Sequence, residues 1–250
     1  MKQMVIVGGG GGLGSALVTH LLDDKHNVIV VGRTEPADDR VVKFYSTDAA
    51  RVDWRSLYLT IEEDTTAPID AVIFVAGTAV FGKTALIPLE SARRTLELNF
   101  WSCTTAARIA AEHWAARNHG GKFFAVLSIS ARRAIPFEAY YSASKAATAR
   151  FLECLQLEYA HKNIEFVSVF PGLLRTPFRR HAEWYGLEPT LAEEGADIQK
   201  TAGALINLLK GGRKARVIGW RERSIDFADR VLPGLYDWVV LRNRVQRLLK

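Results

Sequence analysis

The stretch that decides the fold is Met4 to Gly14, which reads MVIVGGGGGLG. Its four apolar residues predict a short buried strand. The glycines that follow predict a tight turn, because glycine lets the backbone pass close to a neighbour or a ligand. Ser15 to Leu22, SALVTHLL, predict a helix. Strand, glycine turn and helix in this order are typical of the element that binds dinucleotide phosphates at a helix N-terminus.

Five consecutive glycines allow more than one register within this turn. We place the phosphate-binding positions at Gly8, Gly12 and Gly14, with Leu13 between the last two. This spacing suits a turn that follows a strand and opens a helix. The alternative is a flexible loop that binds no ligand.

Further apolar runs predict the other strands of a parallel sheet. A nearly continuous run such as residues 69 to 75 is typical of a strand that is buried on both faces. The runs comprise residues 27–31, 41–45, 69–75, 123–127, 164–170 and 215–218. Helical patterns separate many of them, so we predict an α/β fold. It is a Rossmann-type doubly wound parallel sheet of about seven strands with helices on both faces, in three layers. At 250 residues, the chain 1–250 fits a single domain.

The composition predicts a cytoplasmic protein. No apolar run approaches the roughly 20 residues of a membrane-spanning helix, and the first strand begins too early for a signal peptide. The two cysteines, Cys103 and Cys154, have no metal-ligand spacing. We therefore expect buried free thiols in a reducing compartment and no metal site.

The net charge of +6 fits an anionic cofactor, an acidic substrate, a membrane surface or nucleic acid. Neither a helix-turn-helix nor an aromatic and basic β-platform is visible in the sequence. We therefore expect no nucleic-acid partner.

The ends of the early strands predict the cofactor. Arg33 follows the second strand, and no acidic residue comes before Glu35. Because an arginine at this place pairs with a 2′-phosphate while an acid accepts from a 2′-hydroxyl, the sequence favours NADP(H) over NAD. A solvated arginine stacked on adenine is the alternative. Asp48 could contact the adenine amino group, and the small residues Ala76 and Gly77 let the backbone pass close to a ligand.

The catalytic prediction begins with Tyr141 and Lys145, which project from one face of a predicted helix. A nearby cation favours the phenolate, lowers the pKa of the phenol and makes it usable as a general acid/base. Ser128 lies thirteen residues earlier at the end of a strand, where parallel sheets bind ligands. Asn99, within a helix predicted over residues 90–117, must be hydrogen-bonded if it is buried. A surface pair of tyrosine and lysine is the alternative reading of the first two residues.

In combination these features resemble the classical short-chain dehydrogenase/reductase family over most of the chain. The resemblance rests on the order and approximate spacing of Gly8, Gly12, Gly14, Asp48, Ala76-Gly77, Asn99, Ser128, Tyr141-x-x-x-Lys145 and Pro171-Gly172.

The resemblance implies a catalytic set of Asn99, Ser128, Tyr141 and Lys145. Tyr141 would transfer the substrate proton, and Ser128 would hydrogen-bond the substrate oxygen. Lys145 would hold the nicotinamide ribose and lower the pKa of Tyr141, while Asn99 would position a water in a proton relay. Ser128 is preferred to Ser130 because the family's serine usually precedes the tyrosine by thirteen residues.

The resemblance also assigns the segment after the sixth strand. Pro171, Gly172 and the residues up to Thr176 would cover the nicotinamide, with Thr176 near its carboxamide. A substrate loop would follow over about residues 177–200. It mixes aromatic and basic side chains, which fits either a pocket for a carboxylate, phosphate or carrier-linked acyl substrate or a solvated basic surface.

The implied function is NADP(H)-dependent interconversion of a ketone and a secondary alcohol. A non-catalytic NADP-binding regulatory protein on the same fold is the alternative from another functional class. Members of the family commonly form homodimers or homotetramers through two long helices, here about residues 90–117 and 141–162.

A C-terminal helical tail is predicted over about residues 234–250. From Trp238 to Lys250 it has an apolar face, a basic face and no acidic residue. Such a helix could dock on its own fold, pack against a partner subunit or lie peripherally on an anionic membrane surface.

Overall fold

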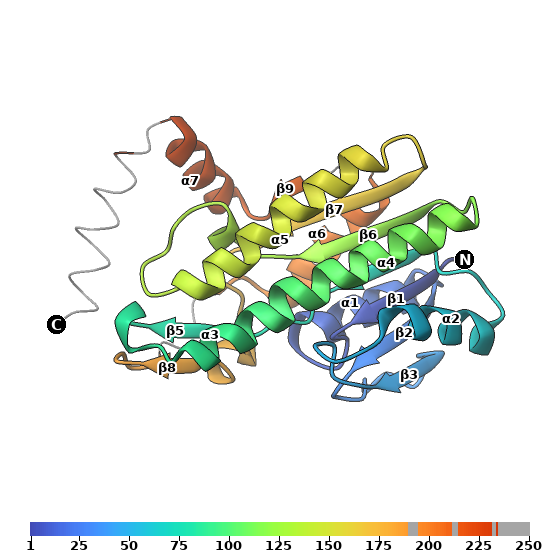
Figure 1. Cartoon of the computed structure of the whole chain (residues 1–250), viewed down its shortest axis with the longest axis horizontal. Coiled ribbons are helices and arrows are strands. Elements are labelled where there is room, and N and C mark those ends of the chain that lie inside the picture. The colour runs from blue at the N-terminus through green and yellow to red at the C-terminus, as the bar shows by residue number, and fades with distance from the viewer. Residues whose placement is uncertain (190–194, 212–214, 232–233, 235–250) are drawn as a thin grey trace.

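A computed structural model describes residues 1–189, 195–211, 215–231 and 234 of the chain (Figure 1). Seven parallel strands form its central sheet, in the order β3-β2-β1-β4-β6-β7-β9. The strands are β1 (Gln3–Val7), β2 (Asn27–Gly32), β3 (Lys43–Ser46), β4 (Ala71–Phe74), β6 (Gly121–Val126), β7 (Ile164–Phe170) and β9 (Ala215–Val217). The predicted doubly wound sheet of about seven strands is confirmed. Its strand order reverses between β1 and β4, where such sheets have their ligand crevice.

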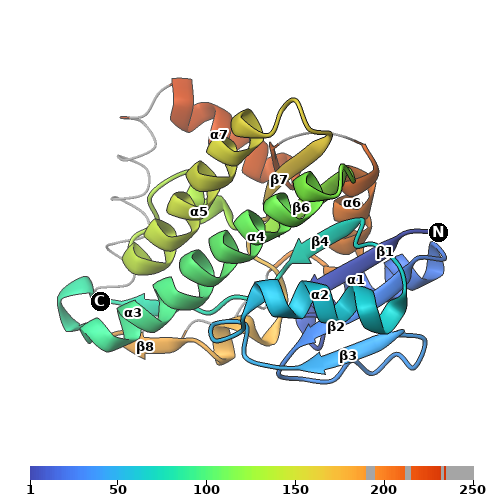
Figure 2. The same ribbon diagram turned by 45° about the vertical axis from the view of Figure 1, so that its right-hand side comes forward.

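Helices cover both faces of the sheet (Figures 1 and 2). One face carries α1 (Gly12–Asp23) and α6 (Ile198–Lys210), and the other carries α2 (Trp54–Thr65), α4 (Cys103–Ala116) and α5 (Ala139–Glu158). Alternate residues of one strand enter opposite cores: Val5 packs on the side of α2, α4 and α5, and Ile6 on the side of α1 and α6. This is why the strands are continuously apolar, and it confirms the three-layer prediction.

Residues 89 to 116 are helical throughout, but the segment is not the regular helix that the sequence predicts. It consists of α3 (Leu89–Leu96), a π-helical turn η2 (Glu97–Ser102) and α4. Asn99 lies in this turn, and its backbone carbonyl accepts a hydrogen bond from Thr148 Oγ1 at 3.0 Å. Because π-turns frequently occur at functional sites, this irregularity supports Asn99 as a candidate site residue.

A second, two-stranded parallel sheet was not predicted. It joins β5 (Val80–Gly82) to β8 (Glu183–Tyr185), with Phe81 opposite Trp184. Three short 3₁₀ helices lie nearby: η1 (Thr84–Leu86), η3 (Ile129–Ala131) and η4 (Pro177–Arg180). Glu183 also accepts hydrogen bonds from Ser91 Oγ (2.6 Å) and Arg94 Nη2 (2.9 Å) of α3. The segment after β7 is thereby fixed against the segments that follow β4.

The two cysteines and two large apolar side chains differ in their exposure. Cys103 is a buried free thiol as expected, and burial raises its pKa to about 12. Cys154 is exposed, so the expectation that both thiols are buried is wrong for it, because it lies on the outer face of α5. Trp101 in η2 and Leu157 in α5 are 55% and 77% exposed, respectively.

The last described helix, α7 (Trp220–Val231), follows β9. Among the described residues, none of the helices combines the length and the apolar character needed to cross a membrane. The predicted basic helix from Trp238 to Lys250 lies outside the described residues.

Candidate active site

The glycine turn connects β1 to α1 at the carboxyl end of the sheet. Gly8 has a φ of +91°, and a Cβ there would lie 2.7 Å from the backbone nitrogen of Ala76. A Cβ on Gly14 would lie 2.0 Å from the carbonyl oxygen of Gly8. Both positions require glycine, because the turn packs directly on the backbone beyond β4 and on the start of α1.

The outer side of the turn is open. A Cβ on Gly11 would meet no atom within 4 Å, and one on Gly12 would approach only the side chain of Thr176, at 3.7 Å. Gly12 begins α1, whose first N–H groups have no acceptor within the helix and carry partial positive charge. Leu13, by contrast, has its side chain in the core. The free space, the amide groups and the helix N-terminus fit a phosphate group.

Two of the predicted adenosine contacts lie at the ends of β2 and β3. Arg33 is exposed directly after β2 and makes no hydrogen bond or ion pair with any described residue. Its guanidinium is therefore available to an anion. Asp48 is half-buried, and one of its oxygens accepts from the Ala50 amide at 3.1 Å.

Asn99 joins three segments of the site. Its Nδ2 donates to the Thr78 carbonyl (2.8 Å) and to Ser144 Oγ (3.0 Å), while its Oδ1 accepts from the Thr78 amide (2.9 Å). A Cβ on Gly77 would lie 3.2 Å from Asn99 Oδ1 and 3.3 Å from Lys145 Nζ. The π-turn, the Ala76-Gly77 segment and α5 thus meet at one point, and the Asn99 amide holds them together.

Tyr141 and Lys145 project from the same face of α5, as predicted. They are 8% and 5% exposed, and Lys145 Nζ lies 6.0 Å from the centre of the Tyr141 ring. The ammonium also lies 3.4 Å from the Val126 carbonyl at the end of β6. The pair therefore stands inside the molecule at the carboxyl end of the sheet, which removes the alternative of a surface pair.

Burial governs the protonation of both groups. It raises the pKa of Tyr141 above its ordinary value of 10.0, and a hydrogen bond with Ser128 and the charges of Glu138 and Arg179 have smaller effects. It lowers the pKa of Lys145 to about 8. The expectation that Lys145 lowers the pKa of Tyr141 is therefore wrong for this structure, because desolvation dominates. Tyr141 is a neutral phenol at pH 7 and is poised to donate its proton.

Both candidate serines belong to one chain of hydroxyl groups. Ser128 contacts Tyr141, donates to Ser130 Oγ at 3.1 Å, and accepts from the Ser130 amide at 3.1 Å. Ser130 in turn donates to Glu138 Oε2 at 2.8 Å. Sequence reasoning chose Ser128 as the partner of Tyr141 but missed Glu138. The sequence signal that could have identified Glu138 is its position, three residues before Tyr141 on the same helical face.

An aromatic wall covers Tyr141. The rings of Phe81 and Phe178 lie 5.8 Å and 6.0 Å from the tyrosine ring, and Trp184 lies 4.9 Å from Phe81. Phe178 and Trp184 come from the predicted substrate loop, which is held here by the pairing of β5 with β8. A substrate that reaches Tyr141 must therefore contact this loop.

The basic residues of this region have different surroundings. Arg179 stacks on the Phe81 and Trp184 rings, at 4.5 and 5.1 Å from their centres, and its Nη1 lies 3.5 Å from Glu138 Oε1. Arg132 instead pairs with Asp226 of α7 at 3.2 Å. Only part of the predicted basic cluster thus faces Tyr141.

The segment after β7 connects the two halves of the site. The Pro171 carbonyl accepts from the Ile129 amide at 2.9 Å, and the half-buried Gly172 follows it. Thr176 caps η4 through the Phe178 amide at 3.3 Å and approaches Gly12. The segment predicted to cover the nicotinamide therefore runs from the candidate serines to the glycine turn. Among the residues that the structure describes, no cluster of three His, Cys, Asp or Glu side chains is placed to hold a metal ion.

Comparisons with known proteins agree with this geometry. A family model described as short chain dehydrogenase matches residues 2–184. The dehydrogenase/reductase SDR family protein 7-like of Anopheles gambiae is 23% identical, over 99% of this chain and 84% of its own.

Two solved structures share the fold. A short chain dehydrogenase from Burkholderia cenocepacia in complex with NADP superposes with a TM-score of 0.80 at 23% identity, covering 98% of this chain and 100% of its own. A 4-hydroxyisoleucine dehydrogenase complexed with NADH gives a TM-score of 0.74 at 19% identity, covering 88% and 98%.

Proposed function

Because the chain belongs to the short chain dehydrogenase family, we propose that it is an NADP(H)-dependent oxidoreductase of ketones and secondary alcohols. The observation that carries this proposal is the meeting of Tyr141, Ser128, Lys145 and Asn99 beside an open glycine turn. The meeting point is the carboxyl end of a parallel sheet, where this fold binds its ligands.

The residues that would hold the cofactor follow the carboxyl ends of the strands, where sheets of this kind bind ligands. When bound, the nicotinamide supplies or accepts the hydride. The exposed guanidinium of Arg33 supports a preference for the 2′-phosphate of NADP(H), and the start of α1 supports a pyrophosphate site. The proposed set is Gly8, Gly12, Leu13, Gly14, Arg33, Asp48, Ala76, Gly77, Tyr141, Lys145, Pro171, Gly172 and Thr176.

The chemistry of the protein is proton transfer and positioning. Tyr141 is protonated at pH 7 and gives its proton to the carbonyl oxygen of the substrate, and Ser128 beside it positions the phenol. Asn99 keeps α5 in place against the β4–β5 segment. The rings of Phe81, Phe178 and Trp184 exclude water and contact the apolar part of the substrate.

The test is NADPH oxidation with a panel of neutral and anionic ketones, with Tyr141→Phe as the control. NADPH binding is measured separately by titration calorimetry. We expect turnover in the wild type and binding without comparable turnover in the variant. The alternative function, a non-catalytic NADP-binding regulator, predicts equal NADPH binding in both proteins and turnover in neither.

We further propose that the chain forms a homodimer or homotetramer. The exposed Trp101 and Leu157 leave large apolar surface on η2 and α5, and α4 and α5 lie side by side in both views (Figures 1 and 2). A monomeric mass by light scattering at micromolar concentration would contradict the proposal. A cytoplasmic location and a peripheral membrane contact of the C-terminal tail stay predictions.

A further inference from the structure

Glu138 is a buried carboxylate whose place in the site is unusual. It occupies the N-cap position of α5, where an acidic side chain normally accepts from the first amides of the helix, but its side chain makes no capping hydrogen bond. Instead, Oε2 accepts from Ser130 of η3, and Oε1 faces Arg179 of η4. Both oxygens are therefore directed to the active site rather than to the helix.

The number of available hydrogens fixes the donor and the acceptor of each hydrogen bond in the series Ser128–Ser130–Glu138. An ionised carboxylate only accepts, so the single hydroxyl hydrogen of Ser130 points to Glu138. The hydrogen between the two serines must then come from Ser128. The Ser128 oxygen keeps only acceptor capacity for Tyr141. In a hydrogen bond between these two hydroxyls the phenol is therefore the donor, which requires its protonated form.

The two charges near Tyr141 act in opposite senses, and the effect of Glu138, which raises the pKa of the phenol, is larger than that of Arg179, which lowers it. Tyr141 of α5 and Arg179 of η4 face Glu138 together with the hydroxyl of Ser130 in η3, while Arg132 of the adjacent turn pairs with Asp226. The negative charge of Glu138 raises the pKa of Tyr141. The contact with Ser128 would lower that pKa only if Ser128 donated the hydrogen bond, and the hydrogen of Ser128 is directed to Ser130.

We propose that Glu138 is a positioning residue that acts through Ser130 and Ser128 to keep Tyr141 protonated, and so adapts the enzyme to carbonyl reduction. The inference rests on the proposed function and adds the favoured direction to it. In that direction the carbonyl carbon takes a hydride from NADPH and the oxygen takes the proton of Tyr141. The phenolate then regains a proton from water. Alcohol oxidation needs the phenolate from the start, and Glu138 disfavours it.

Glu138→Gln is the decisive variant, because it keeps the shape of the side chain. Arg179 prefers the amide oxygen, which turns the amide nitrogen to Ser130 as a donor. Ser130 can then donate to Ser128, and Ser128 to Tyr141, so the whole chain reverses. The negative charge is lost as well. Both changes lower the pKa of Tyr141, and we expect a downward shift of about one unit or more.

The shift is measured without substrate, as the phenolate absorbance of each protein minus that of the same protein carrying Tyr141→Phe. In turnover, the alkaline loss of carbonyl reduction and the acid loss of alcohol oxidation should both move to lower pH. Glu158→Gln, an exposed carboxylate of the same helix, is the matched control and should titrate as the wild type. An unshifted Tyr141 in Glu138→Gln overturns the proposal.

Two variants of Ser130 test the path rather than the charge. Ser130→Ala interrupts the chain and leaves the carboxylate, so the shift should be in the same direction but smaller. Ser130→Thr restores the hydroxyl and should restore the wild-type titration. If Glu138→Gln does not fold, an unshifted Ser130→Ala overturns the proposal instead. A shift of Tyr141 in a protein that reduces no carbonyl compound would support the positioning role and count against the proposed function.

Discussion

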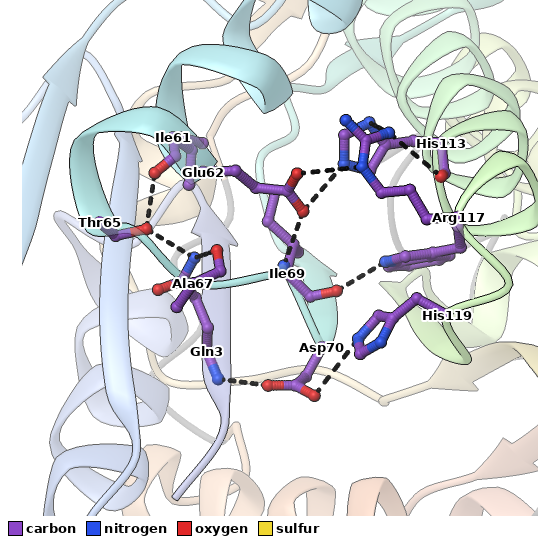
Figure 3. A network of polar contacts seen from close by, with 11 residues as sticks. Gln3, Ile61, Glu62, Thr65, Ala67, Ile69, Asp70, His113, Arg117 and His119 are labelled. Carbon is purple, nitrogen blue, oxygen red and sulfur yellow. Dashed lines mark hydrogen bonds and ion pairs between the residues drawn. The ribbon is translucent and has the colours of Figure 1, made fainter.

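At the carboxyl end of the sheet, burial raises the pKa of Tyr141 and lowers that of Lys145 to about 8, so it disfavours the charged form of each group, although Lys145 still carries its charge at pH 7. At the amino end, Glu62 of α2 is also largely buried but stays ionised (Figure 3). Burial alone would raise its pKa. The close contact with His113 Nε2 (2.9 Å), the hydrogen bond from the Ile69 amide (3.0 Å) and the charge of Arg117 outweigh burial and lower the pKa of Glu62.

The amino-end network extends beyond Glu62. Arg117 Nη1 lies 3.0 Å from His113 Nδ1, which accepts because a guanidinium only donates, and His113 Nε2 lies 2.9 Å from Glu62 Oε1. In β1, the backbone amide of Gln3 donates to Asp70 Oδ2 at 2.7 Å, and its side-chain Nε2 donates to Thr65 Oγ1 at 2.8 Å. Figure 3 shows how these contacts join β1, α2, the start of β4 and the end of α4.

The difference between the two ends concerns the number of partners. The amino end surrounds its charge with donors, so the charge holds the fold together. The carboxyl end buries groups whose charged forms have too few partners, and this arrangement costs stability but provides reactive protonation states. Removal of a charge should therefore stabilise one end and destabilise the other.

Tyr141→Phe should have the largest effect on activity of the variants that distinguish the two ends. It removes the proton donor and leaves the ring packed against Phe81, so we expect turnover to fall by about 10² to 10⁴. NADPH affinity and the free energy of unfolding should stay close to wild type. Steady-state kinetics, calorimetry and urea unfolding measure the three quantities. Near-wild-type turnover on a reducible carbonyl would refute the assignment.

Lys145→Met should separate activity from stability. Turnover and cofactor affinity should fall, because Lys145 is proposed to serve both. The unfolded chain keeps the lysine proton up to the ordinary pKa of 10.5, whereas the folded protein loses it near 8. The buried ammonium thus destabilises the wild type at pH 7, and the variant should be more stable by up to about 3 kcal/mol.

The same linkage predicts that wild-type stability gains a contribution as the pH rises from about 8 to 10.5, which Lys145→Met should lack. Urea unfolding at pH 7 and at higher pH tests this difference. Lys162→Met, at an exposed position, is the control and should change stability little. A clear loss of stability in Lys145→Met at pH 7 would contradict the desolvation argument.

Glu62→Gln tests the opposite end. We expect a loss of about 1–3 kcal/mol, because the buried His113 loses its charged partner and the Ile69 amide loses a charged acceptor. Turnover should not change. The pKa of Glu62 is depressed in the folded protein, so its contribution is full above the ordinary value of 4.5 and is lost as the pH falls through the lower folded value. Glu153→Gln, which removes a surface ion pair with Arg150, is the control and should cost under about 1 kcal/mol.

Arg33→Ala should have the smallest effect. It tests an exposed charge at the carboxyl end of the sheet. The side chain makes no ion pair with any residue in the described ranges, so the free energy of unfolding should stay unchanged. NADPH affinity should fall about tenfold with NADH affinity unaffected, the size of one lost charge-assisted hydrogen bond. Equal dissociation constants for NADPH and NADH in the wild type would contradict the assignment of Arg33.

The sequence predicts those parts of the molecule that local pattern controls. The strand from Ile164 to Phe170 follows from its apolar run, and the Tyr141–Lys145 face follows from helical spacing. The sheet of β5 and β8 is not predicted, because three residues per strand leave no periodicity to detect. The π-turn cannot be predicted from the sequence either, because its composition is that of any amphipathic helix.

Charged contacts between distant segments are the other part that sequence pattern does not show. Glu138 meets Arg179 across forty-one residues, and Glu62 meets His113 between two helices. Each acid taken alone reads as a solvated surface residue. Only the fold shows that Glu138 lies beside the hydroxyl groups of the candidate site and Glu62 within the polar network at the amino end of the sheet.

The π-turn at Glu97–Ser102 also constrains the length of the chain. A wider helical turn holds an additional residue, so deletion of one residue here would allow a regular α-helix to form. The helix before the deletion would then rotate by about 100° relative to the helix after it. Asn99 could not face Thr78 and Ser144 while α3 and α4 both kept their packing. This segment should accept many substitutions on its outer face but no insertion or deletion, so gene libraries that vary its length should yield folded but inactive proteins.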